Sequence, residues 1–366
     1  MSSWKECKLG DVAFFQRGHD LPKSQMNDGL IPVAGSNGVI GFHDKSTTKA
    51  PGITIGRSGN IGTPKFYNQD FWAHNTVLYV KDFKGNDEKF VFYFLNTIDL
   101  SGFNSGSAVP TLNRNHIHEI DVKIPPLEEQ KAIAEVLSSL DDKIDLLHRQ
   151  NQTLESLAQT LFRQWFIEEA KEEWEEKTLS YFGDIICGKT PSKSNSQYFD
   201  GNVPFIKIPD MHGNTFIFKT TDTLSEIGKE SQKNKTLPPK SICVSCIATV
   251  GLVSMNIIES QTNQQINSII PNKDIYRYFI YLFMQSSYDL LHAMASGGTA
   301  TLNLNTGDFS KMEILKPDDE TLKIFHQVIE PTFDKIFINS KQIQTLENLR
   351  DTLLPKLLSG EVRVKI

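Results

Sequence analysis

Cys243 and Cys246 are separated by two residues, which is a spacing used by redox-active dithiols and by zinc ligands. No second pair of Cys or His residues with ligand spacing accompanies them in the sequence. The pair begins in the β-like run Ile242–Val244. We therefore expect half-buried, unreactive thiols and no bound metal.

The segment Gly56–Gly62 (GRSGNIG) is rich in glycine, but no helical pattern follows it, which argues against a dinucleotide-binding fingerprint. Two interpretations stay open: a tight connection between strands, or a loop whose backbone closely approaches a ligand such as DNA. His116 and His118 would share one face of a strand. Without a third ligand nearby, we expect them to be solvated surface residues.

Catalytic motifs are absent from the sequence. It has no Gly-x-x-x-x-Gly-Lys-Ser/Thr phosphate-binding loop. It also has no Asn/Asp-Pro-Pro-aromatic run of the kind used by amino-methyltransferases, and no nuclease-like cluster of carboxylates and lysine. We therefore expect a chain that is not itself an enzyme.

Recognition of another molecule is the chemistry that remains. Polar side chains are concentrated in loops that flank glycines; Arg and Lys suit guanine, Asn and Gln suit adenine, and hydroxyls suit phosphates. Each such residue, taken singly, is equally compatible with ordinary solvated surface. The predicted DNA-contacting residues of the first half are Arg57, Ser58, Asn60, Lys65, His74, Asn75, Ser105, Ser107, Asn113 and Arg114. Those of the second half are Lys189, Ser192, Lys193, Lys207, Asp210, Thr249, Gln264, Gln265, Thr299 and Asn303.

These residues lie in a chain that repeats itself about 190 residues later. Gln150–Leu157 (QNQTLESL) returns as Gln342–Leu349 (QIQTLENL), an offset of 192. The tripeptide at Thr111 matches the one at Thr301, an offset of 190, and Trp4 matches Trp174, an offset of 170. The repeat is longer than the roughly 20 to 50 residues of a solenoid unit. It therefore indicates a duplicated module, made of a domain and a helix, with internal pseudo-two-fold symmetry.

Each module ends in a predicted long helix. Pro125 and Pro126 favour a helix start, and the apolar residues that follow alternate at spacings of four and three, as in a coiled-coil seam. Because each helix follows its own domain, we expect the two helices to pair antiparallel, with the polar seam residues Asn151 and Asn339 fixing the register. An alternative is that they are ordinary bundle helices of a larger assembly. The predicted seam residues are Ile133, Leu137, Leu140, Ile144, Leu147, Leu154, Leu161, Ile329, Ile336, Ile343, Leu346 and Leu353.

The regions before these helices have another pattern. They contain short β-branched runs, such as Gly52–Ile55, Thr76–Val80 and Ser241–Val244, and one clear helix each, at Glu88–Asn96 and Tyr276–Gln285. We therefore predict an α+β protein with two mixed α/β domains, residues 1–126 and 174–317. The two long helices are expected within residues 127–173 and 318–366.

The net charge of −6 is unevenly distributed. Residues 1–126 and 178–317 each carry +1, whereas residues 127–177 carry −7. The near-neutral domains neither support nor exclude DNA binding. No stretch approaches 18 consecutive apolar residues, and the N-terminus lacks the apolar segment of a signal peptide, so we expect a cytoplasmic protein without a membrane span.

The layout resembles the specificity subunit of type I restriction–modification systems along essentially the whole chain. The motifs at the helices are Ile124–Ala134 (IPPLEEQKAIA) and Leu353–Val362 (LLPKLLSGEV). Two weaker ones, VPFIKI from Val203 and TNQQIN from Thr262, lie in the second domain. The first domain departs from the pattern, with AHNT from Ala73 where the second has QQIN from Gln264.

The resemblance implies two target-recognition domains, each recognising one half of a bipartite site in double-stranded DNA. It implies that the long helices set the gap between the halves and dock two copies of a methyltransferase subunit, and that a motor-nuclease subunit joins the complex. S-adenosylmethionine, ATP and Mg²⁺ would then bind to those partners and not to this chain. Arg57–Asn60 aligns with the dissimilar Cys246–Thr249, so we expect two different half-sites and no palindrome. The alternatives are a coiled-coil scaffold without a DNA role, or a methyltransferase or nuclease in its own right.

Overall fold

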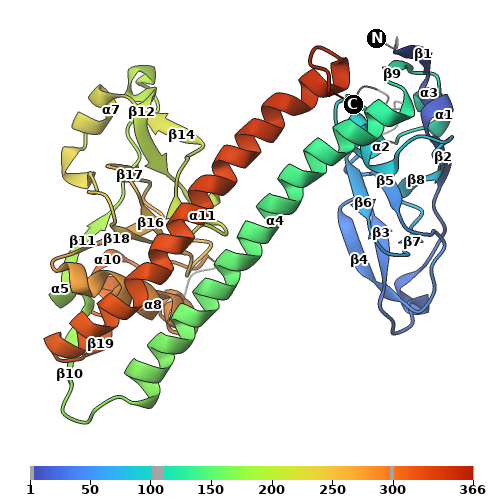
Figure 1. Cartoon of the computed structure of the whole chain (residues 1–366). Coiled ribbons are helices and arrows are strands. Elements are labelled where there is room, and N and C mark those ends of the chain that lie inside the picture. Colours follow the sequence, from blue (N-terminus) through green and yellow to red (C-terminus); the bar gives the residue numbers. More distant parts are fainter. Residues whose placement is uncertain (1–3, 101, 103–110, 297–300, 366) are drawn as a thin grey trace. The chain divides into compact units, whose positions relative to one another are not determined.

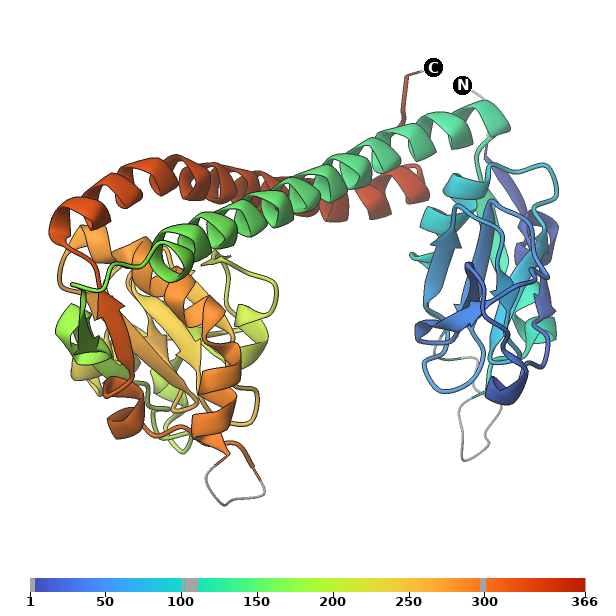
Figure 2. The same ribbon diagram turned by 90° about the horizontal axis from the view of Figure 1, so that it is seen from below.

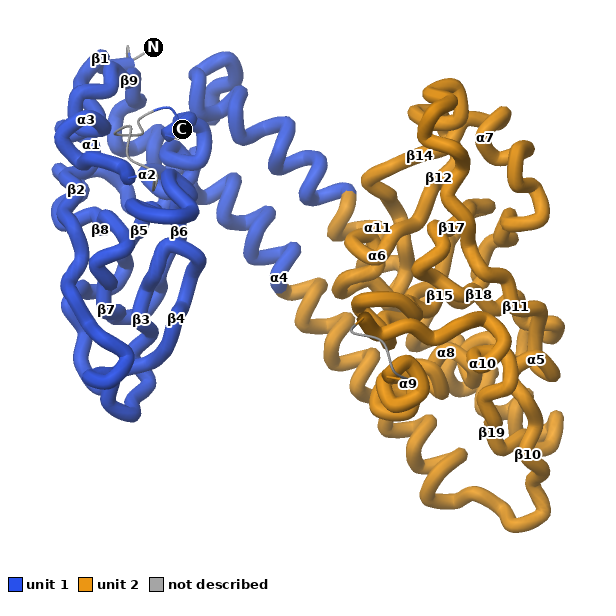
Figure 3. The backbone as a smooth tube through the Cα atoms, turned by 180° about the vertical axis from the view of Figure 1, so that it is seen from behind, with its two compact units in different colours: residues 1–145, 345–366 blue, residues 146–344 orange. Residues whose placement is uncertain are grey.

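The computed structural model describes residues 4–100, 102, 111–296 and 301–365. Two compact units divide the chain: residues 1–145 with 345–366 form unit 1, and residues 146–344 form unit 2 (Figure 3). Each unit combines β-sheets with helices, which confirms the predicted α+β class (Figure 1). Within the described residues, every helix is too short or too polar to span a bilayer.

Unit 1 is built on a four-stranded antiparallel sheet in the order β2-β8-β5-β6. A three-stranded sheet in the order β4-β3-β7 adjoins it, and β1 pairs with β9. Helix α2 contributes Phe90 and Leu95 to a core shared with Ile53 and Leu78 of the large sheet. The strands are β1 (Lys5–Lys8), β2 (Phe14–Arg17), β3 (Ile31–Gly35), β4 (Gly38–His43), β5 (Gly52–Gly56), β6 (Pro64–Tyr67), β7 (Trp72–Ala73), β8 (Val77–Asp82) and β9 (Asp121–Ile124). The helices of its globular part are α1 (Leu9–Val12), η1 (Lys23–Gln25), α2 (Glu88–Leu95) and α3 (Arg114–His118).

Unit 2 repeats this plan with additional elements. Its main sheet has the order β11-β18-β15-β16-β13, a second sheet has the order β14-β12-β17, and β10 pairs with β19. The strands are β10 (Glu175–Thr178), β11 (Gly183–Cys187), β12 (Phe199–Ile206), β13 (Phe216–Ile217), β14 (Asp222–Leu224), β15 (Ile242–Ser245), β16 (Val253–Asn256), β17 (Gln261–Thr262), β18 (Ile266–Pro271) and β19 (Glu313–Lys316). The helices are α5 (Leu179–Phe182), η4 (Ser196–Tyr198), α6 (Ile208–Met211), α7 (Glu226–Glu230), η5 (Lys233–Lys235), η6 (Asp274–Tyr276), α8 (Arg277–Ser286), α9 (Tyr288–Ala295) and α10 (Thr306–Ser310).

The repeat extends to individual backbone hydrogen bonds. The N–H of Leu112 donates to the carbonyl of Arg57 at 2.8 Å, and the N–H of Leu304 donates to the carbonyl of Cys246 at 2.9 Å. These bonds align Leu112 with Leu304, an offset of 192. The offset of 190 expected here from the sequence is therefore wrong by two residues, because a chance Thr-Leu-Asn match lies beside the structural equivalent.

A second alignment is also corrected by backbone pairing. The N–H groups of Gly18 and Gly188 donate at 3.0 Å to the carbonyls of Val77 and Ile266, respectively. This offset of 189 places Asn75 opposite Gln264. The mismatch expected between AHNT and QQIN was a register error of two residues, and both domains carry a side-chain amide at this position.

The two long helices, α4 (Leu127–Arg163) and α11 (Asp319–Ser359), lie side by side and antiparallel (Figures 1 and 2). Within unit 1, Arg350 Nη1 donates to Asp141 Oδ1 at 2.9 Å. Within unit 2, Asn339 pairs with Asn151, and Phe162 packs against Phe325 further along. In unit 2, later residues of α4 meet earlier residues of α11, which confirms the predicted antiparallel pair.

Both long helices lie within the ranges expected from the sequence, residues 127–173 and 318–366. Helix α4 ends at Arg163 and passes into a π-helical turn, η3 (Gln164–Glu168), whereas α11 continues past Pro331 and Pro355. Each proline removes one backbone hydrogen bond. Packing outweighs this loss, because apolar residues on both sides are buried, including Phe333 and Leu357.

Seven of the twelve predicted seam residues are buried, and the other five are partly buried: Leu140, Leu154, Leu161, Leu346 and Leu353. The largest departure from the expected pattern is at the end of α4. Phe162 and Phe166 are buried there, whereas the predicted seam residue Leu161 is only partly buried. The buried residues here are Ala158, Phe162 and Phe166, which are spaced four residues apart. At this end the helix buries a wider apolar face, because it also packs against the aromatic core around Phe279.

Candidate nucleic-acid interface

Three loops of unit 1 meet at one end of its four-stranded sheet. The N–H of Arg57, just after β5, donates at 2.8 Å to the carbonyl of Thr76, just before β8. Ser58 forms an isolated bridge with Thr111, at the start of the segment that carries Asn113. These pairings bring Arg57, Ser58, Asn60, His74, Asn75, Asn113 and Arg114 to neighbouring loops. Lys65 lies apart from them within β6, where it pairs with Thr54.

Some of these side chains already have local partners. Asn113 caps α3, its Oδ1 accepting from the N–H of Asn115 at 3.0 Å. Asn75 Nδ2 donates to Asp20 Oδ1, and His74 Nδ1 lies 3.0 Å from Thr76 Oγ1. Such contacts hold polar loops in place while leaving part of each side chain exposed.

Arg17 is a cationic neighbour that sequence reasoning missed. It ends β2 and precedes Gly18, whose backbone is bonded to this same group of loops. Partial burial and the nearby Arg17 guanidinium lower the pKa of Arg57. Arg17 also forms an ion pair with Asp20 at 3.6 Å, so the two guanidinium groups and this carboxylate leave one net positive charge at the edge, which favours an anion such as a DNA phosphate. The position of Arg17 directly before a loop glycine, Gly18, was the sequence feature that could have indicated its role.

The same loops converge in unit 2. The N–H of Cys246 donates at 2.8 Å to the carbonyl of Gln265, and the N–H of Lys189 donates at 2.9 Å to the carbonyl of Thr262. Thr190 Oγ1 donates to Gln264 Oε1 at 2.7 Å, and Ile247 bridges with Asn303. The exposed residues thus brought to neighbouring loops are Lys189, Thr249, Gln264 and Asn303, with Gln265 partly buried beside them.

One backbone conformation in these loops is strained. Ala248 has φ of +65°, and Gly59, its counterpart at an offset of 189, has φ of +81°. The left-handed region suits glycine and costs energy for alanine. A strained residue held in a loop is typical of functional sites, which supports a recognition role for Thr249 and its neighbours.

Lys207 and Asp210 have structural roles in unit 2. Asp210 is buried, and its carboxylate accepts from the N–H groups of Lys207 and Thr221, both at 2.8 Å. The Lys207 ammonium forms an ion pair with Asp222. Ser192 Oγ lies 2.7 Å from Ser194 Oγ on an exposed loop that also carries Lys193. The predicted residues Ser105, Ser107 and Thr299 lie outside the described residues.

Two expectations about other side chains were wrong. His116 and His118 belong to helix α3 and not to a strand, and the partly buried His118 accepts a 2.9 Å hydrogen bond at Nε2 from the N–H of Phe15. Cys243 and Cys246 are fully and not half buried, because β15 is a central strand. Burial raises the pKa of Cys243 to about 12 and of Cys246 to about 11, so both stay protonated at neutral pH.

Comparison with known proteins identifies relatives of both halves of the chain. The family model described as type I restriction modification DNA specificity domain matches residues 1–156 and again residues 171–348. The type I restriction enzyme HindI specificity subunit of Haemophilus influenzae is 40% identical over 327 residues, covering 69% of this chain and 71% of the relative. The MjaIX specificity subunit of Methanocaldococcus jannaschii is 30% identical over 352 residues, covering 87% and 77%.

A solved structure shares the fold. The type I restriction–modification S subunit from M. genitalium aligns with a TM-score of 0.65 at 16% identity, covering 99% of this chain and 96% of that one. The likeness spans both units and both long helices of the chain.

Proposed function

Because the chain belongs to the type I restriction–modification DNA specificity family, we propose that each of its two domains recognises one half of a bipartite, asymmetric DNA site. The resemblance found in the sequence is confirmed, and the chain is the non-catalytic specificity component of a type I complex that acts on DNA.

The main support for the proposal is that the loops of the two domains share a backbone arrangement but carry different side chains. Equivalent hydrogen bonds hold Arg57 and Cys246 in the same place, yet one is a guanidinium and the other a buried thiol. Asn75 and Gln264 are both amides but differ in length. Since base edges are distinguished by the position of donors and acceptors, such loops favour different base sequences. The two half-sites are therefore expected to differ.

The helix pair is proposed to set the unread gap. Helix α4 has 37 residues, which at 1.5 Å per residue gives a length of about 55 Å. This corresponds to roughly 16 base pairs at about 3.4 Å each. Recognition elements that meet one face of a duplex favour spacings near multiples of about 10 base pairs.

The proposed partners follow from the duplication. Gln150–Leu157 and Gln342–Leu349 give the two helices equivalent surfaces, which suits two copies of one methyltransferase subunit. That subunit would hold S-adenosylmethionine, and a motor-nuclease subunit would use ATP and Mg²⁺, so this chain binds none of the three. The four cysteines are free, as is usual in the reducing cytoplasm, which supports a cytoplasmic place of action.

Matched insertions test the spacing role in the assembled complex. One heptad added to α4 after Leu147 and one added to α11 after Lys341 would keep the seam and lengthen both helices by about 10 Å. The methylated motif should gain about three base pairs of gap and keep both half-site sequences. A heptad in α4 alone is the control and should abolish assembly, because the seams no longer match. An altered half-site with an unchanged gap would contradict the proposal.

The salt dependence of DNA binding distinguishes the proposed function from that of a coiled-coil scaffold without a DNA role. Binding of the assembled complex to a DNA fragment that contains the motif should weaken steeply between low and moderate salt, because phosphate contacts release counterions. Loss of sequence preference across the same series, or no DNA binding at any salt concentration, would favour the scaffold.

A further inference from the structure

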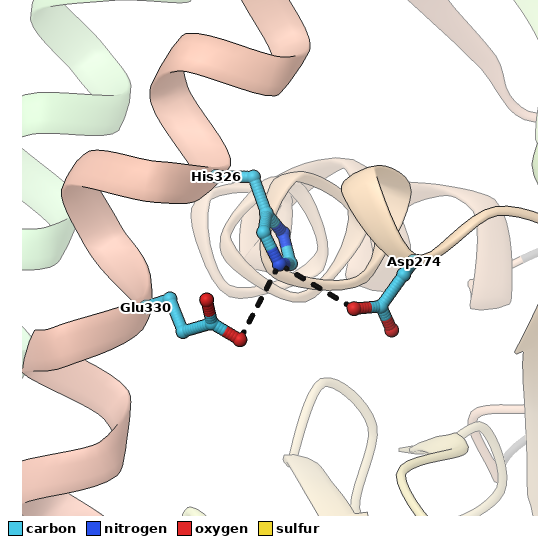
Figure 4. Close-up of side chains that lie close together, drawn as sticks. All are labelled: Asp274, His326 and Glu330. Atoms are coloured by element: carbon cyan, nitrogen blue, oxygen red, sulfur yellow. Dashed lines mark ion pairs between the residues drawn. The ribbon is translucent and has the colours of Figure 1, made fainter.

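Unit 2 contains a cluster of possible metal ligands outside the candidate DNA interface (Figure 4). His326 and Glu330 lie one turn apart on α11, and Asp274 opens η6, just before α8. His326 Nε2 lies 3.5 Å from Asp274 Oδ2 and 3.6 Å from Glu330 Oε1. The three ligand atoms all lie within 4.8 Å of one another.

This spacing fits a small divalent cation. Metal–nitrogen and metal–oxygen bonds of about 2.0 to 2.2 Å at tetrahedral angles place neighbouring ligand atoms roughly 3.3 to 3.6 Å apart. The two distances from His326 Nε2 agree with this range. The carboxylates of Asp274 and Glu330 need only a small side-chain movement to close on the same point.

Hydrogen bonding within the cluster does not satisfy it. A neutral imidazole donates from one nitrogen only, so His326 Nε2 can serve one of the two carboxylates and not both. When Nε2 binds a cation, the neutral ring carries its proton on Nδ1, which is buried and has no hydrogen-bond partner among the described residues. A cation that accepts the Nε2 lone pair removes the repulsion between the two carboxylates.

The surroundings orient the ligands. The guanidinium of the buried Arg277 contacts Asp274 Oδ1, which leaves Oδ2 directed to His326. Carboxylates that bind metals are commonly held by a second group in this way. Tyr278 stacks on the imidazole at 5.2 Å between ring centroids and holds its plane. Arg277 and Lys240 add positive charge nearby, and Asp334 adds negative charge.

The corresponding positions of the first half carry no such ligands. At the established offsets, Asp274, His326 and Glu330 correspond to Gly85, Ala134 and Ser138. The cluster is thus particular to unit 2, and its binding stoichiometry would be one per chain.

We propose that Asp274, His326 and Glu330 bind one divalent first-row cation, of which Zn²⁺ fits the ligand set best, and that the cation fastens α11 to η6 within unit 2. Imidazole and carboxylate ligands suit Zn²⁺ and its neighbours in the series. This inference does not depend on the proposed DNA recognition, because it concerns a separate surface.

The test is titration of the metal-free full chain with ZnCl₂ in a calorimeter, followed by thermal melts with and without Zn²⁺. The expected result is one saturable site per chain and a higher Tm with the metal. Glu330→Gln and Asp274→Asn, both at accessible side chains, should each weaken Zn²⁺ binding tenfold or more and reduce the rise in Tm. Glu320→Gln, on the exposed face of the same helix, is the matched control and should bind as the parent does.

Melts in chelator show that each variant is folded before its affinity is compared. The absence of a saturable site, or a weakening of less than tenfold in both ligand variants, would overturn the proposal. So would equal weakening in Glu320→Gln, because the effect would then be one of general surface charge.

Discussion

Asn339 donates a 2.9 Å hydrogen bond from Nδ2 to Oδ1 of Asn151, joining α11 to α4 within unit 2. Asn339 is fully buried and Asn151 nearly so, and Asn151 Nδ2 in turn donates to Ser340 Oγ at 3.1 Å. A shift of either helix by one heptad would separate the two amides and leave Asn339 facing Ala158 or Ile144. The pair therefore specifies the register that the seam alone leaves open.

Replacement of both amides should cost less than the sum of the two single replacements. Asn339→Leu leaves Asn151 buried with an unpaired carbonyl oxygen, so we expect a loss of about 1 to 3 kcal/mol of unfolding free energy. The double variant Asn151→Leu/Asn339→Leu should lose less than the sum of the single variants, with a coupling of about 0.5 to 3 kcal/mol. Chemical denaturation measures both. Gln342→Leu, on the exposed face of α11, is the control, and additive losses would show that the amides act independently.

The partly buried Glu155 should make stability rise on mild acidification. Burial raises the pKa of Glu155, an effect reduced by a hydrogen bond from Thr215 Oγ1 to Glu155 Oε1. A raised pKa means that the folded state disfavours the charged form, so stability increases as pH falls through the folded pKa towards the ordinary value of 4.5. Glu155→Gln keeps the acceptor without the charge.

Denaturation of both proteins between pH 7 and about 4.5 measures this effect. The Gln variant should be the more stable at pH 7, and the difference should shrink as pH falls. Glu172→Gln, on an exposed segment, should follow the parent throughout. A difference that grows on acidification would contradict the assignment.

Asp318 should contribute stability that acid removes. Its carboxylate accepts from the N–H and the Oγ1 of Thr321, both at 2.8 Å, and so caps α11. These hydrogen bonds lower the pKa of Asp318 to about 2. The contribution is present above the ordinary value of 3.8 and is lost as pH falls towards about 2.

Asp318→Ala should therefore cost about 1 kcal/mol at pH 7, a typical cap value, because the side chain is half exposed and its charge is screened. Asp318→Asn is the control: it retains an acceptor oxygen and should keep most of this stability without the acid dependence. Urea denaturation at pH 7 and pH 3 compares the three proteins. An unchanged stability in Asp318→Ala would show that solvent caps the helix equally well.

Asn75 and Gln264 occupy equivalent positions in the two domains, so a substitution at either one should affect one half-site only. Gln264→Ala should relax base preference within the half-site of the second domain by about 1 to 3 kcal/mol and leave the other half unchanged. Asn75→Ala, at the equivalent position, should do the reverse. Competition binding by the assembled complex with singly altered sites measures this. Equal weakening on all sequences would instead indicate a phosphate contact.

The periodic parts of the chain could be predicted from the sequence. The helix at Glu88 and the two long helices followed from apolar spacings, which depend on local geometry. The duplication followed from the repeated motifs, and the antiparallel pairing followed from the position of each helix after its own domain. The errors arose where hydrogen bonds between residues far apart in the sequence determine the alignment of the two halves. The two-residue shifts at Leu112 and Asn75 are visible only in backbone hydrogen bonds to distant strands, and Asp210 became structural because its carboxylate folds back on its own turn.

The candidate site was predictable in composition but not in arrangement. Arg17 contributes because β2 and β5 both flank β8, a strand order that no local pattern contains. Phe162 and Phe166 replaced the expected seam positions because the recognition domain, and not only the partner helix, packs against that end of α4.

The central claim is that two domains of different DNA specificity are connected by one pseudo-symmetric pair of helices. Modification-sensitive sequencing of DNA methylated by the assembled complex tests it most directly. We predict a bipartite motif with two different half-sites separated by an unread gap of fixed length. A palindromic motif, with the same sequence in both halves, would contradict it.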